Sequence, residues 1–335
     1  MRLRQLLLML LMLHIPFASF AEGIDYMPQI HGTFRGIYEL ETEDGVIRFQ
    51  VRNARLSVSG NILPVIDYYI QFDACEKGKM RFLDAWCRMK LSESFKIQAG
   101  QFRKPFGVDA FRAPADQFFA NRSFIAKQVG NVRGVGLKLV YLHKSLPLTL
   151  EGGVFNSKAV DDQESFNSGV SLAFRGMYKL GNMTFVGGWQ TMKPSVTRIE
   201  LYDATVNWTY DRWFIEGEYM FKHYSDMPNP NCHAYNAQVQ YKMPVKLGVF
   251  NQASFQARFD GMTDHSNGID TDGEGYLAVS DVARNRATVG TTITYKYKSV
   301  HADIRLNYEK YFYHSDFTPT EGNRDKVVAE LVVRF

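Results

Sequence analysis

Residues 326–335 read Lys-Val-Val-Ala-Glu-Leu-Val-Val-Arg-Phe and alternate between two kinds of side chain. One parity is entirely apolar, whereas the other includes Lys326, Glu330 and Arg334. The apolar set is Val327, Ala329, Leu331, Val333 and Phe335. Because successive side chains of a β-strand point to opposite faces, this segment is predicted to be a strand with one apolar and one polar face.

The same period of two recurs along the chain, for example in residues 202–210, 253–260 and 286–298. We therefore predict an all-β protein of sixteen strands. They are expected near residues 30–40, 45–59, 63–75, 81–91, 95–105, 132–142, 146–156, 167–180, 182–193, 198–210, 212–223, 233–243, 249–261, 284–297, 299–311 and 326–335. After the first twenty-odd residues, no stretch approaches the ~18 continuous apolar residues expected of a membrane-spanning helix.

The connections between these strands alternate in length, and this decides between a soluble sandwich and a membrane barrel. Every second connection is very short, as in Gly60-Asn61-Ile62 and Ser92-Glu93-Ser94. The longer connections are 106–131, 157–166, 224–232, 262–283 and 312–325. Short turns at one end and long loops at the other are typical of outer-membrane barrels, whereas a sandwich has no reason to alternate in this way. The predicted fold is a 16-stranded antiparallel transmembrane β-barrel.

Aromatic residues are abundant for a chain whose mean hydropathy is −0.25: there are 25 Phe, 18 Tyr and 4 Trp. Amphipathic rings sit where lipid tails meet headgroups, so barrels carry aromatic girdles near both strand ends. The girdle residues are predicted to include Tyr141, Trp208, Tyr210, Trp213, Tyr219, Phe221, Tyr241, Tyr297, Tyr308 and Tyr311.

The first residues indicate export. Arg2 and Arg4 precede an apolar stretch at 6–13, and Ser19-Phe20-Ala21 places small residues before a cut at Glu22. We predict a signal peptide at 1–21 and a single barrel domain at 22–335 in the bacterial outer membrane. Removing the peptide leaves 37 basic against 35 acidic residues, so any preference for anions depends on where the charges lie.

Residues 95–141 carry a family resemblance. Gly100-Gln-Phe-Arg-Lys-Pro-Phe-Gly107, followed by a long loop and Arg133-Gly-Val-Gly136, resembles the phosphate-selective porin O and P family. Residues 51–60 and 154–156 are similar to further strands of that family. The resemblance implies a sixteen-stranded, usually trimeric, anion-conducting porin. The final strand ending in Phe335 resembles the signal that the barrel-assembly machinery reads.

Selectivity requires a constriction, because a sixteen-stranded barrel leaves a wide aqueous channel. The connection 106–131 shows no alternation and contains Phe111, Phe118, Phe119 and Phe124. A loop this long and aromatic is disfavoured in water, so we predict that it folds into the lumen and packs on the wall. The alternative is an external basic loop that binds lipopolysaccharide phosphates.

Basic residues are concentrated around this loop, with eight of them against two acids between Phe95 and Lys138. Arg and Lys at a constriction attract anions and repel cations. A parity slip between Arg52 and Arg55 predicts a β-bulge that turns both toward the lumen. The candidate anion-pathway residues are Arg52, Arg55, Arg103, Lys104, Arg112, Arg122, Lys127, Arg133, Lys138, Arg175 and Arg258. About half of the basic wall residues are expected to pair with acids on the same face, because unpaired buried charge is costly.

Other chemistries find little support in the sequence. It contains no nucleophile motif, phosphate-cradling glycine loop or dinucleotide fingerprint, so no enzyme activity, cofactor or nucleic acid is predicted. The acids between Asp264 and Glu274 lack the full spacing of a calcium loop, and we predict a solvated extracellular loop there without a metal.

The sequence thus predicts a passive porin for small inorganic or organic anions of the phosphate or polyphosphate type. It is expected to form a homotrimer in contact with outer-membrane lipid and lipopolysaccharide. A general or cation-tolerant porin remains an alternative, as does a receptor or adhesin with a blocked lumen.

Overall fold

A computed structural model describes residues 26–335 apart from 131–132, 158–159, 161–162, 164–165, 167–168 and 315–317. The predicted signal peptide at 1–21 lies outside the described residues. No helix in the described part of the chain is long and apolar enough to cross a membrane.

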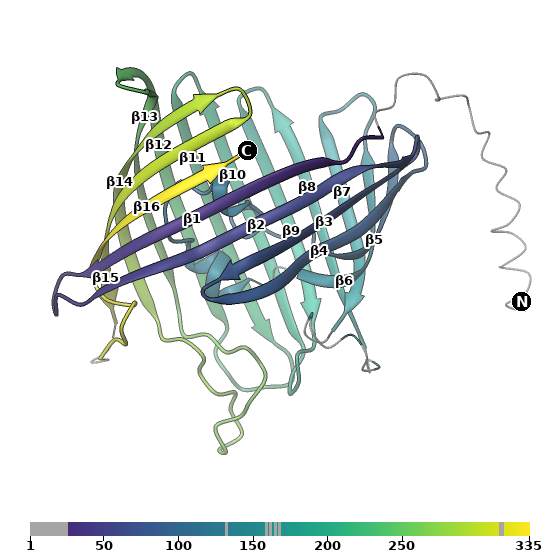
Figure 1. Ribbon diagram of the computed structural model, residues 1–335. Coiled ribbons are helices and arrows are strands. Elements are labelled where there is room, and N and C mark those ends of the chain that lie inside the picture. The colour runs from purple at the N-terminus through teal and green to yellow at the C-terminus, as the bar shows by residue number, and fades with distance from the viewer. Residues whose placement is uncertain are drawn as a thin grey trace, which may run out of the picture.

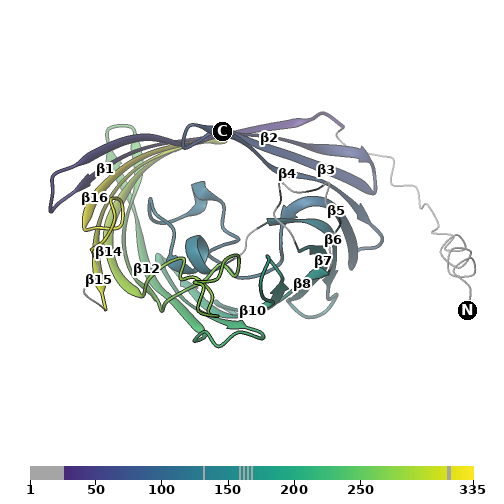
Figure 2. The same ribbon diagram turned by 90° about the horizontal axis from the view of Figure 1, so that it is seen from below.

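Sixteen antiparallel strands form one closed barrel, in which each strand pairs with its neighbours in sequence and the first pairs with the last (Figures 1 and 2). In chain order they are β1 (Gln29–Glu41), β2 (Ile47–Leu63), β3 (Ile66–Glu76), β4 (Lys79–Lys90), β5 (Phe95–Arg103), β6 (Arg133–Leu142), β7 (Leu148–Asn156), β8 (Val170–Leu180), β9 (Met183–Met192), β10 (Ile199–Tyr210), β11 (Trp213–Tyr224), β12 (Cys232–Leu247), β13 (Phe250–Met262), β14 (Arg284–Tyr297), β15 (Val300–Tyr313) and β16 (Lys326–Arg334). Each overlaps one predicted strand, which confirms the fold class.

The two ends of the barrel differ as the loop lengths predicted. Figure 1 shows tight turns at the upper end, whereas the lower end carries the long loops together with the short β1–β2 and β3–β4 connections. The connections β8–β9, β10–β11, β12–β13 and β14–β15 have two residues each, whereas 263–283 links β13 to β14 and 314–325 links β15 to β16. The side chains alternate as predicted: on β14, Val289 is 55% exposed on the outer face, whereas Thr288 is fully buried.

The predicted bulge is present. β1 and β2 change register where Arg35 pairs with Asn53 but Gly36 pairs with Val51, so that Arg52 is the extra residue. A bulge shifts the side-chain parity by one position. Arg52 and Arg55 therefore both line the interior, as predicted.

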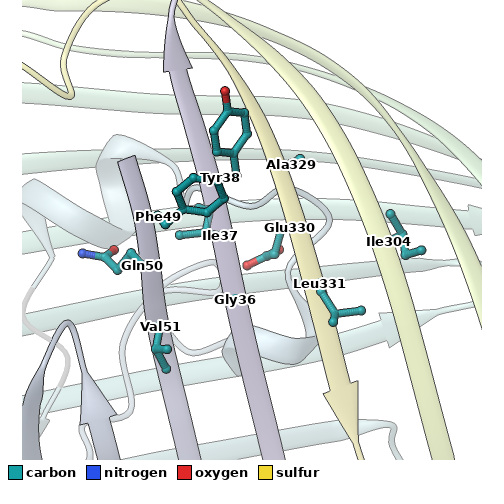
Figure 3. Close-up of a pocket in the computed structure, with 10 residues that line it drawn as sticks. All are labelled: Gly36, Ile37, Tyr38, Phe49, Gln50, Val51, Ile304, Ala329, Glu330 and Leu331. Atoms are coloured by element: carbon teal, nitrogen blue, oxygen red, sulfur yellow. The ribbon is translucent and has the colours of Figure 1, made fainter. Parts of the chain in front are cut away.

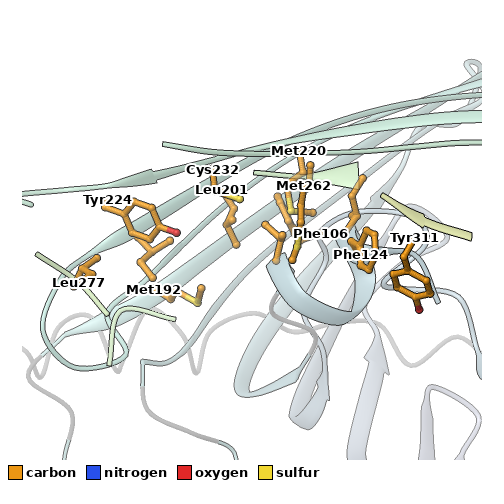
Figure 4. Close-up of a cluster of buried hydrophobic side chains, with 14 residues drawn as sticks. Phe106, Phe124, Met192, Leu201, Met220, Tyr224, Cys232, Met262, Leu277 and Tyr311 are labelled. Atoms are coloured by element: carbon orange, nitrogen blue, oxygen red, sulfur yellow. The ribbon is translucent and has the colours of Figure 1, made fainter. Parts of the chain in front are cut away.

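The rule of a polar interior fails on one side of the barrel. Inward-facing side chains near the long-loop end of β9–β13 are apolar and form a buried cluster (Figure 4). They include Met192, Ile199, Leu201, Met220, Cys232, Ala234 and Met262. Tyr311 also belongs to this cluster, and its hydroxyl donates a hydrogen bond to Glu309 inside the barrel. Its predicted place in the lipid-facing girdle is therefore wrong.

Phe335 extends the β1–β16 pairing that closes the barrel. Phe335 exchanges two backbone hydrogen bonds with Gly32. A Cβ on Gly32 would lie 2.3 Å from the phenyl ring of Phe335, so a larger residue there would require this ring to move.

Candidate functional site: a basic bay beside the inward-folded loop

Residues 104–130 of the connection between β5 and β6, here called the constriction loop, fold into the lumen (Figure 2). It contains two helical turns, η1 (Pro114–Asp116) and η2 (Ile125–Val129). Ile125 is fully buried and Phe119 is 1% exposed. The inward position predicted for 106–131 is confirmed, and the alternative of an external loop is not supported.

Polar wall side chains hold this loop through its backbone, which satisfies peptide groups that would otherwise be buried without partners. The Glu218 carboxylate accepts the Val108 N–H at 2.7 Å, and Asp260 accepts the Phe124 N–H at 3.0 Å. Wall arginines donate to its carbonyl oxygens: Arg35 to Ala120, Arg258 to Asn121, Arg286 to Arg122 and Arg305 to Ala115. Strands β1, β11 and β13–β15 therefore fix the course of the loop.

The phenylalanines of the loop pack on the wall as predicted, and arginines cover their rings. Guanidinium carbons lie 4.0 Å from the ring centroid of Phe111, 4.6 Å from that of Phe119 and 4.5 Å from that of Phe124. The arginines are Arg175, Arg258 and Arg286, in that order. A guanidinium over an aromatic face is favourable when desolvated. Each ring thus covers a wall cation, and Phe119 and Phe124 are also buried.

One half of the lumen is dry. Phe106, Phe124 and Ile125 of the constriction loop pack against the apolar inner face of β9–β13 (Figure 4). Leu277 of the loop 263–283 closes the same cluster, and the Ser266 carbonyl accepts a hydrogen bond from Lys222. We call this region, the loop 263–283 included, the dry half. Part of that loop is buried, although its acids Asp270, Asp272 and Glu274 are exposed, as predicted.

The other half holds water-accessible space. A cavity of about 790 Å³ lies between the constriction loop and the wall formed by β2–β5. We call it the basic bay, because its lining contains eight basic residues and one acid, Glu76. The basic residues are Arg35, Arg52, Arg55, Lys77, Arg81, Arg122, Lys127 and Arg133.

Only half of these cations are neutralised. The pairs are Arg35–Glu330, Arg55–Asp73 at 3.0 Å, Arg81–Glu76 at 3.2 Å and Arg133–Asp84 at 2.9 Å. Among the described residues, no carboxylate lies within ion-pair distance of the remaining four, Arg52, Lys77, Arg122 and Lys127. Two come from the wall side and two from the constriction loop. The bay therefore carries a local positive field.

Burial and neighbouring charges lower the pKa values of two cations of the constriction loop. Burial within the barrel and repulsion by Arg52 lower the pKa of Lys127 to about 7, although its side chain reaches the water of the bay. Burial, opposed by Asp109 and reinforced by Arg55, lowers the pKa of Arg122 to about 10. Arg122 therefore stays charged at neutral pH, whereas Lys127 is only partly charged.

Five of the eleven predicted pathway residues line the bay: Arg52, Arg55, Arg122, Lys127 and Arg133. The other six lie elsewhere, in contacts that hold the wall and the loop together. Arg112 pairs with Asp109 and Glu216, Arg258 pairs with Asp260, and both Lys138 and Arg175 pair with Glu151. Arg103 donates to the carbonyls of Ala110 and Phe111, and Lys104 donates to Ser171.

Sequence reasoning missed three bay residues, Arg35, Lys77 and Arg81. Arg35 shares its inward parity with Ile37, which packs against Ala120 of the constriction loop and masks the polar face. Lys77 lies in the two-residue turn between β3 and β4, where alternation gives no signal. Arg81 lies opposite Asp73 on the neighbouring strand, and this pairing of opposite charges is the signal that indicates its inward position.

A separate hollow of about 630 Å³ lies on the outer face of β1, β2, β15 and β16 (Figure 3). Its lining is mostly apolar and includes Tyr38, Phe49 and Leu331. It shares no lining residue with the basic bay, so it is not part of the space beside the constriction loop.

Comparison with known proteins agrees with this architecture. The model of the phosphate-selective porin O and P family matches residues 26–189, a range that includes every residue lining the bay. Over these residues the chain belongs to that family. No curated relative matches the sequence.

Solved porins share the fold at low identity. The anion-selective porin from Comamonas acidovorans is 11% identical with a TM-score of 0.61, covering 92% of this chain and 98% of that one. The trimer form of OmpT from Vibrio cholerae is 12% identical with a TM-score of 0.62, again with 92% and 98% coverage. OmpF of Salmonella typhi in complex with daunomycin is 12% identical with a TM-score of 0.59, covering 92% and 97%. The family and the fold together identify a channel of the bacterial outer membrane.

Proposed function

We propose that this porin gives passive, anion-preferring diffusion through the basic bay, with phosphate- or polyphosphate-type anions as its favoured solutes. The observation that carries the proposal is a set of four bay cations that have no carboxylate partner within the described part of the chain: Arg52, Lys77, Arg122 and Lys127. Fixed positive charge beside a low-dielectric wall raises the local anion concentration and repels cations.

The chemistry of the bay suits oxyanions. The guanidinium groups of Arg52 and Arg122 present planar donor sets that match phosphate or carboxylate, whereas Lys77 and Lys127 act as point charges. Two of these cations are on the wall side and two on the loop, so an anion in the bay meets positive charge from both sides. Because the bay is open to water, binding is weak enough for the solute to leave, as conduction requires.

We propose a channel rather than an enzyme, since the arginines outside the bay make structural contacts and no activated nucleophile motif occurs in the sequence. A homotrimer is proposed on the basis of the family and of the trimer form described for OmpT. Contacts with lipopolysaccharide, and recognition of the strand ending at Phe335 by the barrel-assembly machinery, are also proposed.

Zero-current potentials of the purified porin in planar bilayers across a KCl gradient test this proposal. The expected sign is that of an anion-preferring pore, and phosphate added to one side is expected to reduce the chloride current by occupying the bay. A potential of the opposite sign would instead support the general or cation-tolerant porin. A complete lack of conductance would support the receptor or adhesin with a blocked lumen.

A further inference from the structure

Asn121 of the constriction loop lies between the bay and two carboxylates of the wall. It is 5% exposed and contacts Arg52 on one side and Glu309 and Glu39 on the other. We propose that Asn121 is a positioning residue for anion preference, which keeps Arg52 out of ion pairs and turned toward the bay by separating it from these carboxylates. This inference rests on the proposed function.

The orientation of the Asn121 amide follows from its partners. Its Nδ2 donates to Glu309 Oε1 at 2.9 Å and to Glu39 Oε1 at 3.4 Å, while its Oδ1 accepts from Arg52 Nη1 at 2.5 Å. Carboxylates require donors and a guanidinium requires an acceptor, so only this amide orientation satisfies all three groups. The side chain is therefore locked by opposite charges on its two sides.

The backbone of the loop is fixed at the same point. The Asn121 carbonyl accepts from Arg258 at 2.9 Å, and the preceding N–H of Ala120 donates to Asn307 at 2.9 Å. The amide is thus held in place independently of Arg52. A rigid neutral group at this position can act on Arg52 without being moved by it.

The carboxylates behind Asn121 already have cationic partners of their own. Glu309 pairs with Arg286 at 3.2 Å, and Glu39 pairs with Lys326 at 3.0 Å. Only the Asn121 amide separates Arg52 from the Glu39 and Glu309 carboxylates. Without this amide, Arg52 would join their ion-pair network. Close pairing of that kind cancels a charge in the field of the pore. Asparagine supplies an acceptor for Arg52 without supplying a negative charge.

The test is a double-mutant cycle on the chloride-to-potassium permeability ratio, using Arg52→Gln, Asn121→Ala and the double variant. Loss of one cation from the lining of the bay is expected to change this ratio roughly two- to fivefold, allowing for salt screening. Asn121→Ala is expected to lower the ratio by this factor, as Arg52→Gln does, and to add nothing in the Arg52→Gln background. Asn121→Asp, which places a carboxylate against Arg52, is expected to lower the ratio at least as far.

Two results would overturn the inference. One is a wild-type chloride-to-potassium permeability ratio in Asn121→Ala. The other is a further drop of this ratio when Asn121→Ala is added to Arg52→Gln, because that would show that Asn121 acts through the position of the loop and not through Arg52. Asn182→Ala in the exposed β8–β9 turn is the matched control, and heat-modifiable migration on gels reports whether each barrel is folded. The wild-type sign tests the proposed function separately, because the change caused by Asn121→Ala is measurable whichever ion the wild type prefers.

Discussion

The two halves of the lumen use the same barrel wall for opposite purposes. Around the dry half, inward-facing positions such as Leu201 and Met220 are apolar and exclude water. Beside β2–β5, the equivalent positions are charged, and four of the bay cations have no carboxylate partner among the described residues. The constriction loop therefore has two roles: it fills one side of the barrel and adds two cations to the other.

The distribution of carboxylates separates the two regions further. Glu216, Glu218, Asp260 and Glu309 face the constriction loop from β11, β13 and β15, where they bind its backbone, Arg112 or the side chain of Asn121. The acids near the bay, Asp73, Asp84 and Glu76, each pair with one cation. Acidic side chains on one side thus hold the constriction loop in place. On the other side, the loop cations Arg122 and Lys127 have no carboxylate partner among the described residues, so they can attract an anion in the bay.

Charge reversal in the bay is expected to have the largest effect. The triple variant Arg52→Glu, Arg122→Glu and Lys127→Glu replaces three uncompensated cations with anions, so the zero-current potential is expected to change sign. Lys246→Glu, at an exposed position near the end of β12, is the matched control and is expected to keep the wild-type sign. An unchanged potential in the triple variant would show that ions do not pass through the bay.

Removing a ring from the dry half is expected to affect the loop more than the charge of the bay. Phe124 is 3% exposed and packs between Arg286 and the apolar cluster. Phe124→Ala is expected to destabilise the folded state by about 3–5 kcal/mol, measured by urea unfolding in detergent. In bilayers the sign of the zero-current potential is expected to persist with noisier current. A loss of less than about 1 kcal/mol would contradict the buried role of this ring.

The pH dependence of selectivity is expected to be smaller and to depend on one residue. Lys127 has a pKa lowered to about 7, so its charge is present below this pH and is lost as the pH rises through it. The chloride-to-potassium permeability ratio is therefore expected to fall roughly two- to fivefold between pH 6 and pH 8. Lys127→Arg, which stays charged, is expected to abolish this change. An equal pH dependence in Lys127→Arg would assign it to another group.

The sequence predicted the barrel well because strand alternation and loop length are local signals. The bulge at Arg52 could be predicted for the same reason, since a parity slip appears within a few residues. The ion pairs of the basic residues could not be predicted from the sequence. Whether Arg258 faces water or Asp260 and Phe119 depends on strand register and on the path of a loop more than a hundred residues away in sequence.

The dry half was missed because an apolar inward position is indistinguishable from an irregular strand in sequence. Tyr311 was assigned to lipid for this reason, although the loop provides it with a buried environment. The position of Lys77 in the bay was not predicted because this residue lies in a turn, where side chains do not alternate between two faces. The bay is thus a tertiary feature built from locally predictable strands.

Thiol labelling under current recording tests most directly whether the water path lies in the basic bay. In a background in which Cys75, Cys87 and Cys232 are replaced by serine, Lys127→Cys reports on the bay and Ala234→Cys on the dry half. An anionic sulfonate thiol reagent is expected to react with Lys127→Cys and reduce its chloride current, while leaving Ala234→Cys, at a fully buried position, unchanged. Rapid block of Ala234→Cys with no effect on Lys127→Cys would place the water on the other side of the loop and contradict the account.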